Sequence, residues 1–154
     1  MSDNQNISWP DLTKRPPRSP RCRLGGYVIL ARLLDKGRAA IAGKNGEFTY
    51  DAPMDQHLKE FMGLDFPALK EQLATGAGDG EILAWVNANA KPPRAAWEIE
   101  AWSTFMERRG PSGDVETLQY FAGYVGKFAQ EREDVKTWFD LVDLDDHVTF
   151  GGKP

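Results

Sequence analysis

The sequence predicts an all-α protein, a compact bundle of some six or seven helices with an extended N-terminal arm rich in proline and arginine. Apolar residues recur at intervals of three and four along most of the chain, which is typical of amphipathic helices. Proline, glycine and aspartate separate these segments by short connections, as in a helical bundle. Alternation of apolar and polar residues is confined to 47–50, so we expect at most a minor β element there.

Residues 1–24 are expected to form the extended arm, ahead of a single helical domain over 25–154. Proline fixes φ and lacks a backbone N–H, so the prolines at 10, 16, 17 and 20 prevent a continuous helix. Up to residue 50 the chain has nine Lys and Arg against four Asp and Glu, whereas the rest has ten against nineteen. A basic arm on a protein of net charge −4 indicates a binding surface, either for another molecule or for the acidic part of the same chain.

The helices are expected to follow one another with short turns between them. They start near residues 27, 53, 66, 79, 94, 114 and 135. Asp51 and Asp65 precede two of these starts, and we expect Asp79 and Asp114 to act as helix caps. Large apolar residues of the second half are spaced at helical intervals, and we expect five of them to share one core: Trp97, Phe105, Leu118, Phe121 and Trp138.

Several segments of the chain are similar to one family. They cover residues 11–21, 24–27, 33–36, 42–48, 78–86 and 138–145. In these segments the chain resembles an uncharacterised bacterial family, domain of unknown function 5069. The resemblance extends over nearly the whole length and implies a complete bacterial protein, with Cys22 and Gly37 as departures from other members. It implies no particular activity, cofactor or catalytic residue.

Neither a membrane span nor a disulfide is expected. No apolar run approaches the roughly 20 residues that cross a bilayer, and the N-terminus lacks the features of a signal peptide. We therefore expect a cytoplasmic protein that does not bind membranes. Cys22, the single cysteine, excludes an internal disulfide and a cysteine-based zinc cage, and we interpret it as incidental rather than nucleophilic.

Four residues that lie close in sequence, Tyr50, Asp51, Asp55 and His57, could supply a proton-transfer group, because histidine titrates near neutral pH. The simpler interpretation, which we prefer, is that Asp51 caps a helix and His57 lies on its solvent face. The acidic run at 140–147 lacks the spacing of a calcium loop, and the two histidines are far apart, so we expect no metal. No glycine motif of a phosphate or dinucleotide site is present, so we expect no cofactor.

The basic arm has three interpretations. Its arginines could bind nucleic-acid phosphates, but we do not favour this interpretation because the rest of the chain is acidic and repels a polyanion. Residues 15–18 could form a linear motif for another domain. We prefer a third interpretation, in which the arm docks on its own helices and Arg15, Arg18 and Arg21 pair with an acidic patch. That patch includes Asp140 and Asp143, which we expect near the C-terminal end of the last helix, and the acidic residues at 145 and 146.

We expect a non-catalytic binding or accessory module that recognises a small anionic ligand or a protein partner near the arm and residues 35–38. The alternative is a metal-independent hydrolase or isomerase that uses a carboxylate with Tyr50 or His57, and a second alternative is nucleic-acid binding through the arm. Whether the protein is an enzyme, and its oligomeric state, stay open. The candidate ligand-binding residues are Arg15, Arg18, Arg21, Tyr27, Asp35, Arg38, Tyr50, Asp55 and His57.

Overall fold

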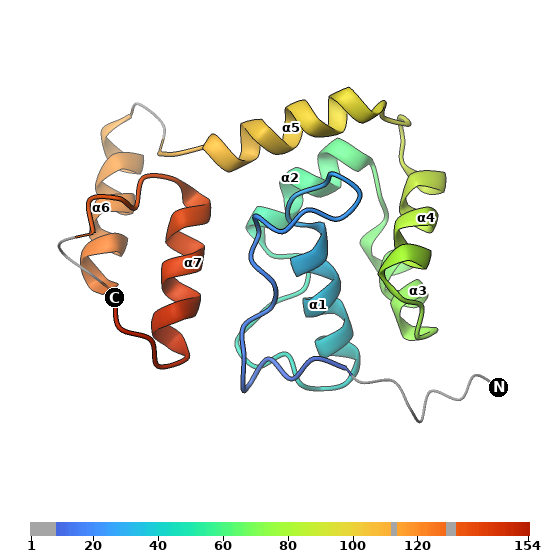
Figure 1. The fold of residues 1–154 in the computed structure, drawn as a ribbon, viewed down its shortest axis with the longest axis horizontal. Helices are drawn as coiled ribbons and strands as arrows, with labels where there is room; N and C mark the ends of the chain where they lie inside the picture. The colour runs from blue at the N-terminus through green and yellow to red at the C-terminus, as the bar shows by residue number, and fades with distance from the viewer. Residues whose placement is uncertain (1–8, 112–113, 129–131) are drawn as a thin grey trace.

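Seven helices make up the fold in a computed structural model that describes residues 9–111, 114–128 and 132–154 (Figure 1). They are α1 (Leu30–Ile41), α2 (Pro53–Met62), α3 (Phe66–Ala74), α4 (Asp79–Asn89), α5 (Ala96–Arg108), α6 (Val115–Phe128) and α7 (Trp138–Thr149). The all-α prediction is confirmed, and within these ranges residues 47–50 form no strand. No helix in the described part of the chain is long and apolar enough to cross a membrane.

Helix α1 is the centre of the main core. Its residues Leu30, Leu33 and Leu34 are fully buried, and the helix packs against α3. Gly37 permits this close approach, because a Cβ atom there would lie 2.6 Å from the side chain of Leu73. The departure at Gly37 noted from the sequence therefore lies at a helix–helix contact.

The apolar residues of the second half do not share one core. Helix α5 bridges the α1–α4 body and the α6–α7 pair (Figure 1), and its inner face buries Ile99 and Met106. The opposite face carries Trp97 and Phe105, which are 71% and 64% exposed. A separate small cluster under α6 and α7 contains Phe121, Val135, Leu141 and Leu144, with Trp138 packed against it, whereas Leu118 is exposed. The single-core prediction was wrong because α5 has two apolar stripes, and periodicity does not tell which one faces inward.

The capping residues at the helix starts follow the prediction at only some positions. Asp114 caps α6, since its Oδ1 accepts a hydrogen bond from the Thr117 N–H at 2.8 Å. Asp79 is the first residue of α4 and follows the cap Gly78. Its carboxylate does not cap the helix but accepts hydrogen bonds from Arg18 and Arg38. Asp51 is not the cap of α2 either. It precedes the cap Ala52, whose N–H is bound by the Asp55 carboxylate from inside the helix at 2.8 Å.

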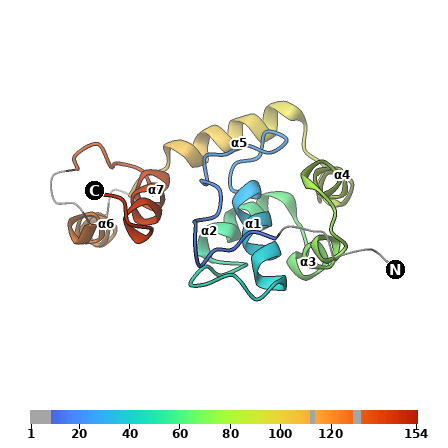
Figure 2. The ribbon, with the colours of Figure 1, turned by 60° about the horizontal axis from the view of Figure 1, so that its bottom comes forward.

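The described part of the arm, residues 9–24, docks on its own domain, as predicted. In two views it runs between α7 and the α1–α2 pair (Figures 1 and 2). Leu12, Pro17 and Pro20 are buried, and the Leu12 N–H donates to the carbonyl of Lys44 at 2.8 Å. Buried apolar residues and a backbone hydrogen bond, in addition to ion pairs, therefore fix the arm to the helical domain.

The ion pairs of the arm differ in part from the prediction. Arg21 contacts Asp143 at 3.0 Å and also pairs with Asp140, as expected. Arg18 pairs with carboxylates of α1 and α4 instead, and Arg15 is exposed. Asp140 and Asp143 lie in the first half of α7, which extends to residue 149, rather than near its C-terminal end. The helix dipole therefore does not oppose these two charges, and it stabilises Asp140, which lies in the first turn.

Candidate ligand-binding groove

The basic site predicted near the arm is internally neutralised. Arg18 binds Asp35 at 3.0 Å and Asp79 at 2.7 Å, and Arg38 binds the other oxygen of Asp79 at 2.7 Å. Burial alone would raise the pKa of Asp79, but hydrogen bonds from Arg18 and Arg38 outweigh it and hold this pKa below its usual value. Of the predicted arginines, Arg15 alone forms no ion pair with a described residue, and it lines a hollow of about 290 Å³ together with Arg38. The structure thus brings Arg18, Asp35 and Arg38 together as a closed ion-pair network.

The other candidate residues have separate partners. Tyr27 is buried in the main core, with its ring edge-on to Phe61. The Tyr50 hydroxyl donates to the carbonyl of Phe66 at 2.7 Å, and burial raises its pKa, so the hydroxyl stays protonated at neutral pH. Asp55 is paired with Lys36. The sequence cluster at 50–57 is therefore not one hydrogen-bonded unit.

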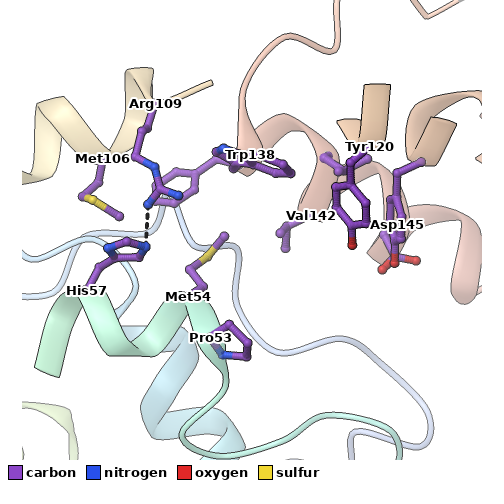
Figure 3. A pocket seen from close by; sticks show the side chains of 12 residues that line it. Pro53, Met54, His57, Met106, Arg109, Tyr120, Trp138, Val142 and Asp145 are labelled. Carbon is purple, nitrogen blue, oxygen red and sulfur yellow. Dashed lines mark hydrogen bonds between the residues drawn. The ribbon is translucent and has the colours of Figure 1, made fainter. Parts of the chain in front are cut away.

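His57 faces a cavity of about 320 Å³ between α2, the end of α5, α6 and α7 (Figure 3). We call this cavity the α2–α7 groove; its walls are mainly apolar and include Met54, Trp138 and Val142. Its polar groups include Arg109, which lies beside His57. The volume is at the lower end of the range of small-molecule sites, about 300–1,000 Å³.

Arg109 is held by a neutral histidine. Its Nη1 lies 2.6 Å from the Nε2 atom of His57, so the guanidinium donates and the imidazole accepts. Burial lowers the pKa of His57, the charge of Arg109 lowers it further, and Glu60 opposes both. Among the described residues no carboxylate forms an ion pair with Arg109. The groove therefore has a cation in its wall that His57 orients and that no described carboxylate neutralises by an ion pair.

The connection after α5 fixes the position of Arg109. The backbone N–H of Trp138 donates to the Arg109 carbonyl at 3.1 Å, and the Trp138 indole donates to the Gly110 carbonyl at 3.1 Å. A Cβ atom at Gly110 would lie 2.9 Å from the carbonyl of Lys136, so the two segments approach closely. Sequence reasoning missed Arg109, because a basic residue after a helix end is common and nothing local connects it with His57.

A more polar hollow of about 350 Å³ adjoins the groove and shares Asp145 with it. In its wall the Lys36 ammonium lies 2.6 Å from Asp55, and Arg32 lies 2.7 Å from Asp146. Burial lowers the pKa of Lys36 although Asp55 opposes this, and burial raises the pKa of Asp146 although Arg32 opposes it. The two pairs connect α1 with α2 and α7.

In the part of the chain that the structure describes, no group of three or more His, Cys, Asp and Glu is arranged to hold a metal ion. Cys22 is an exposed free thiol.

The lowered pKa of His57 predicts that the protein becomes less stable in mild acid. Between the usual histidine pKa of about 6.5 and the lower folded value, the unfolded chain binds a proton that the folded chain does not. Unfolding is therefore favoured as pH falls through this window. Chemical denaturation at several pH values gives the free energy of unfolding as a function of pH. The decrease of this free energy toward acid pH should be shallower for His57→Gln than for the wild type. The same substitution at the exposed His147 is the matched control, and an unchanged slope in His57→Gln would contradict the assignment.

The fold and the groove define an all-α protein with a cavity of small-molecule size between two groups of helices. The family model described as a domain of unknown function (DUF5069) matches residues 14–148, and the chain belongs to this family. No curated protein matches the chain.

Proposed function

We propose that this protein is a non-catalytic binding module for a small organic anion, held in the α2–α7 groove with its anionic group on Arg109. The observation that carries the proposal is the state of Arg109, a cation beside an apolar cavity, oriented by neutral His57 and without an ion pair within the described residues. A guanidinium in such a position binds a carboxylate through charge-assisted and often bidentate hydrogen bonds. The apolar walls favour a ligand with a hydrocarbon or aromatic body.

The groove is a better anion site than the arm. Three arginines at the arm already contact carboxylates of the same chain: Arg18, Arg21 and Arg38. A ligand or a nucleic-acid phosphate would have to displace these carboxylates. At Arg18 and Arg38 these ion pairs are part-buried, so displacing them leaves a carboxylate without a partner, which costs free energy. An anion that binds Arg109 does not have to displace a described carboxylate, so this free-energy cost does not arise there.

A binding role is also favoured over the hydrolase or isomerase alternative. General acid–base catalysis needs a base within hydrogen-bond reach of the reacting group, and a second group that orients it. The Tyr50 hydroxyl donates its hydrogen bond to a backbone carbonyl, and His57 accepts a hydrogen bond from the cation Arg109. Neither is hydrogen-bonded to a carboxylate in the part of the chain that the structure describes.

Calorimetric or NMR titration with simple carboxylates tests the proposal. The probes are para-methylbenzoate and straight-chain alkanoates of increasing length, each compared with its uncharged amide. We expect the wild type to prefer the carboxylates, and Arg109→Met to weaken their binding by about tenfold or more, which corresponds to the loss of a hydrogen bond to a charged group.

Arg108→Met is the matched control, because Arg108 is the preceding residue, is exposed and does not line the groove. It should bind the carboxylates like the wild type. Equal affinity for acid and amide, or equal losses in the two arginine variants, would contradict the proposal.

A further inference from the structure

Opposite charges lie at the two ends of the α2–α7 groove. In Figure 3 Arg109 and His57 lie together at one end, and Asp145 lies at the other, next to Tyr120. The side chains of Trp138 and Val142 lie between these two ends. The groove therefore offers a cation, an apolar middle and an anion in that order.

Resting on the function proposed above, we infer that the ligand is bipolar and carries a protonated amine that binds Asp145, at the end opposite its carboxylate. The class is an ω-amino or aminoaryl carboxylate, in which an apolar body separates the two charges. A ligand with both charges on neighbouring atoms would reach only one end, because the apolar side chains intervene.

Asp145 differs from the other carboxylates of α7. Asp140 and Asp143 both pair with Arg21, and Asp146 pairs with Arg32. Asp145 accepts a hydrogen bond from the Thr149 hydroxyl at 3.2 Å and has no ion pair with any described residue. The acidic run thus leaves one carboxylate uncompensated, and this carboxylate lines the groove.

The charged groups near Asp145 include Lys127, which lies over the ring of Tyr124, and the neighbouring carboxylates Asp143 and Asp146. In the adjoining hollow, Arg32 and Lys36 are each matched by a carboxylate, so these pairs add no net positive charge. Glu47 lines the same hollow and adds a negative charge. At the other end Glu60 acts on His57, but the guanidinium of Arg109 lies in direct contact with the imidazole. A bipolar ligand therefore has one favourable orientation.

Matched pairs of probes test this inference. Each ω-amino alkanoate of a length series is compared with the alkanoate of equal length, and para-(aminomethyl)benzoate with para-methylbenzoate. If Asp145 receives the amine, at least one amino compound should bind the wild type about tenfold more tightly than its partner. If it does not, burying an unpaired ammonium should make every amino compound the weaker binder.

Asp145→Asn separates the two proposals. It should remove the preference for the amino compounds and leave the affinity for the plain carboxylates unchanged or slightly increased, whereas Arg109→Met should weaken both sets. A length series in which no amino compound exceeds its partner on the wild type would overturn the bipolar inference, and this comparison needs no variant. The function proposed above would survive that result, since it is tested separately by the preference for plain carboxylates over their amides and by the loss of carboxylate binding in Arg109→Met.

Discussion

Replacing Lys36 by methionine is expected to lower the free energy of unfolding by about 3–5 kcal/mol, the cost of leaving one partner of a buried ion pair alone. The side chains of Lys36 and Asp55 are only 5% and 1% exposed, and their charged atoms are 2.6 Å apart. Oδ1 of Asp55 has no hydrogen-bond partner among the described residues, so without Lys36 the carboxylate would keep only the N–H of Ala52. Urea denaturation at neutral pH measures the loss.

A double-mutant cycle provides the control. Asp55→Asn keeps an oxygen that can bind the Ala52 N–H but leaves the Lys36 ammonium buried without a counter-charge, so it should also be strongly destabilising. The double variant Lys36→Met/Asp55→Asn contains neither charge and should be much more stable than the sum of the single losses predicts. Strict additivity would show that the two groups do not stabilise each other.

Shortening Leu12 to alanine is the second large effect, and we expect a loss of about 2–5 kcal/mol. Leu12 is 1% exposed although it belongs to the arm, and its backbone N–H is paired with the loop after α1. A cavity at this position would weaken the docking of the whole segment, including the ion pairs of Arg18 and Arg21. Thermal or urea denaturation should therefore show a single transition at lower stability.

Arg15→Ala is the control for the arm, because Arg15 is exposed and in the same segment. It should leave the stability within about 0.5 kcal/mol of the wild type. If Leu12→Ala unfolds like the wild type, the arm is not part of the cooperative unit, and the docked arrangement is contradicted.

The fold class could be predicted from the sequence, because helix periodicity and proline breaks act locally. The positions of α2, α3 and α4 follow from such signals, and the four prolines of the arm indicated an extended segment. The outward position of Trp97 and Phe105 could not be predicted, since α5 presents apolar residues on two sides and tertiary packing selects one.

The site was predictable only in part. His57 was a candidate, but for proton transfer rather than for orienting a cation. Arg109 was missed because its contact with His57 joins residues 52 positions apart, and charge patterns do not specify such pairs. Asp145 was seen as one of several acidic residues on the last helix. What distinguishes Asp145, a position in the groove without an ion pair to a described residue, is visible only in the structure, where Arg21 and Arg32 pair with its neighbours.

The most direct test of the binding site is the NMR spectrum of the tryptophan indole groups during a titration with the best carboxylate probe. Trp138 lines the α2–α7 groove, whereas Trp9 lines the hollow beside Arg15 and Arg38 at the arm. Substitution of each tryptophan by phenylalanine assigns the signals. We predict that the Trp138 indole signal shifts until the site is saturated, and that Arg109→Met needs about tenfold or more probe for the same shift. The Trp9 signal should stay constant. A saturating shift of Trp9 with Trp138 unchanged would place the anion at the arm and contradict the groove as the binding site.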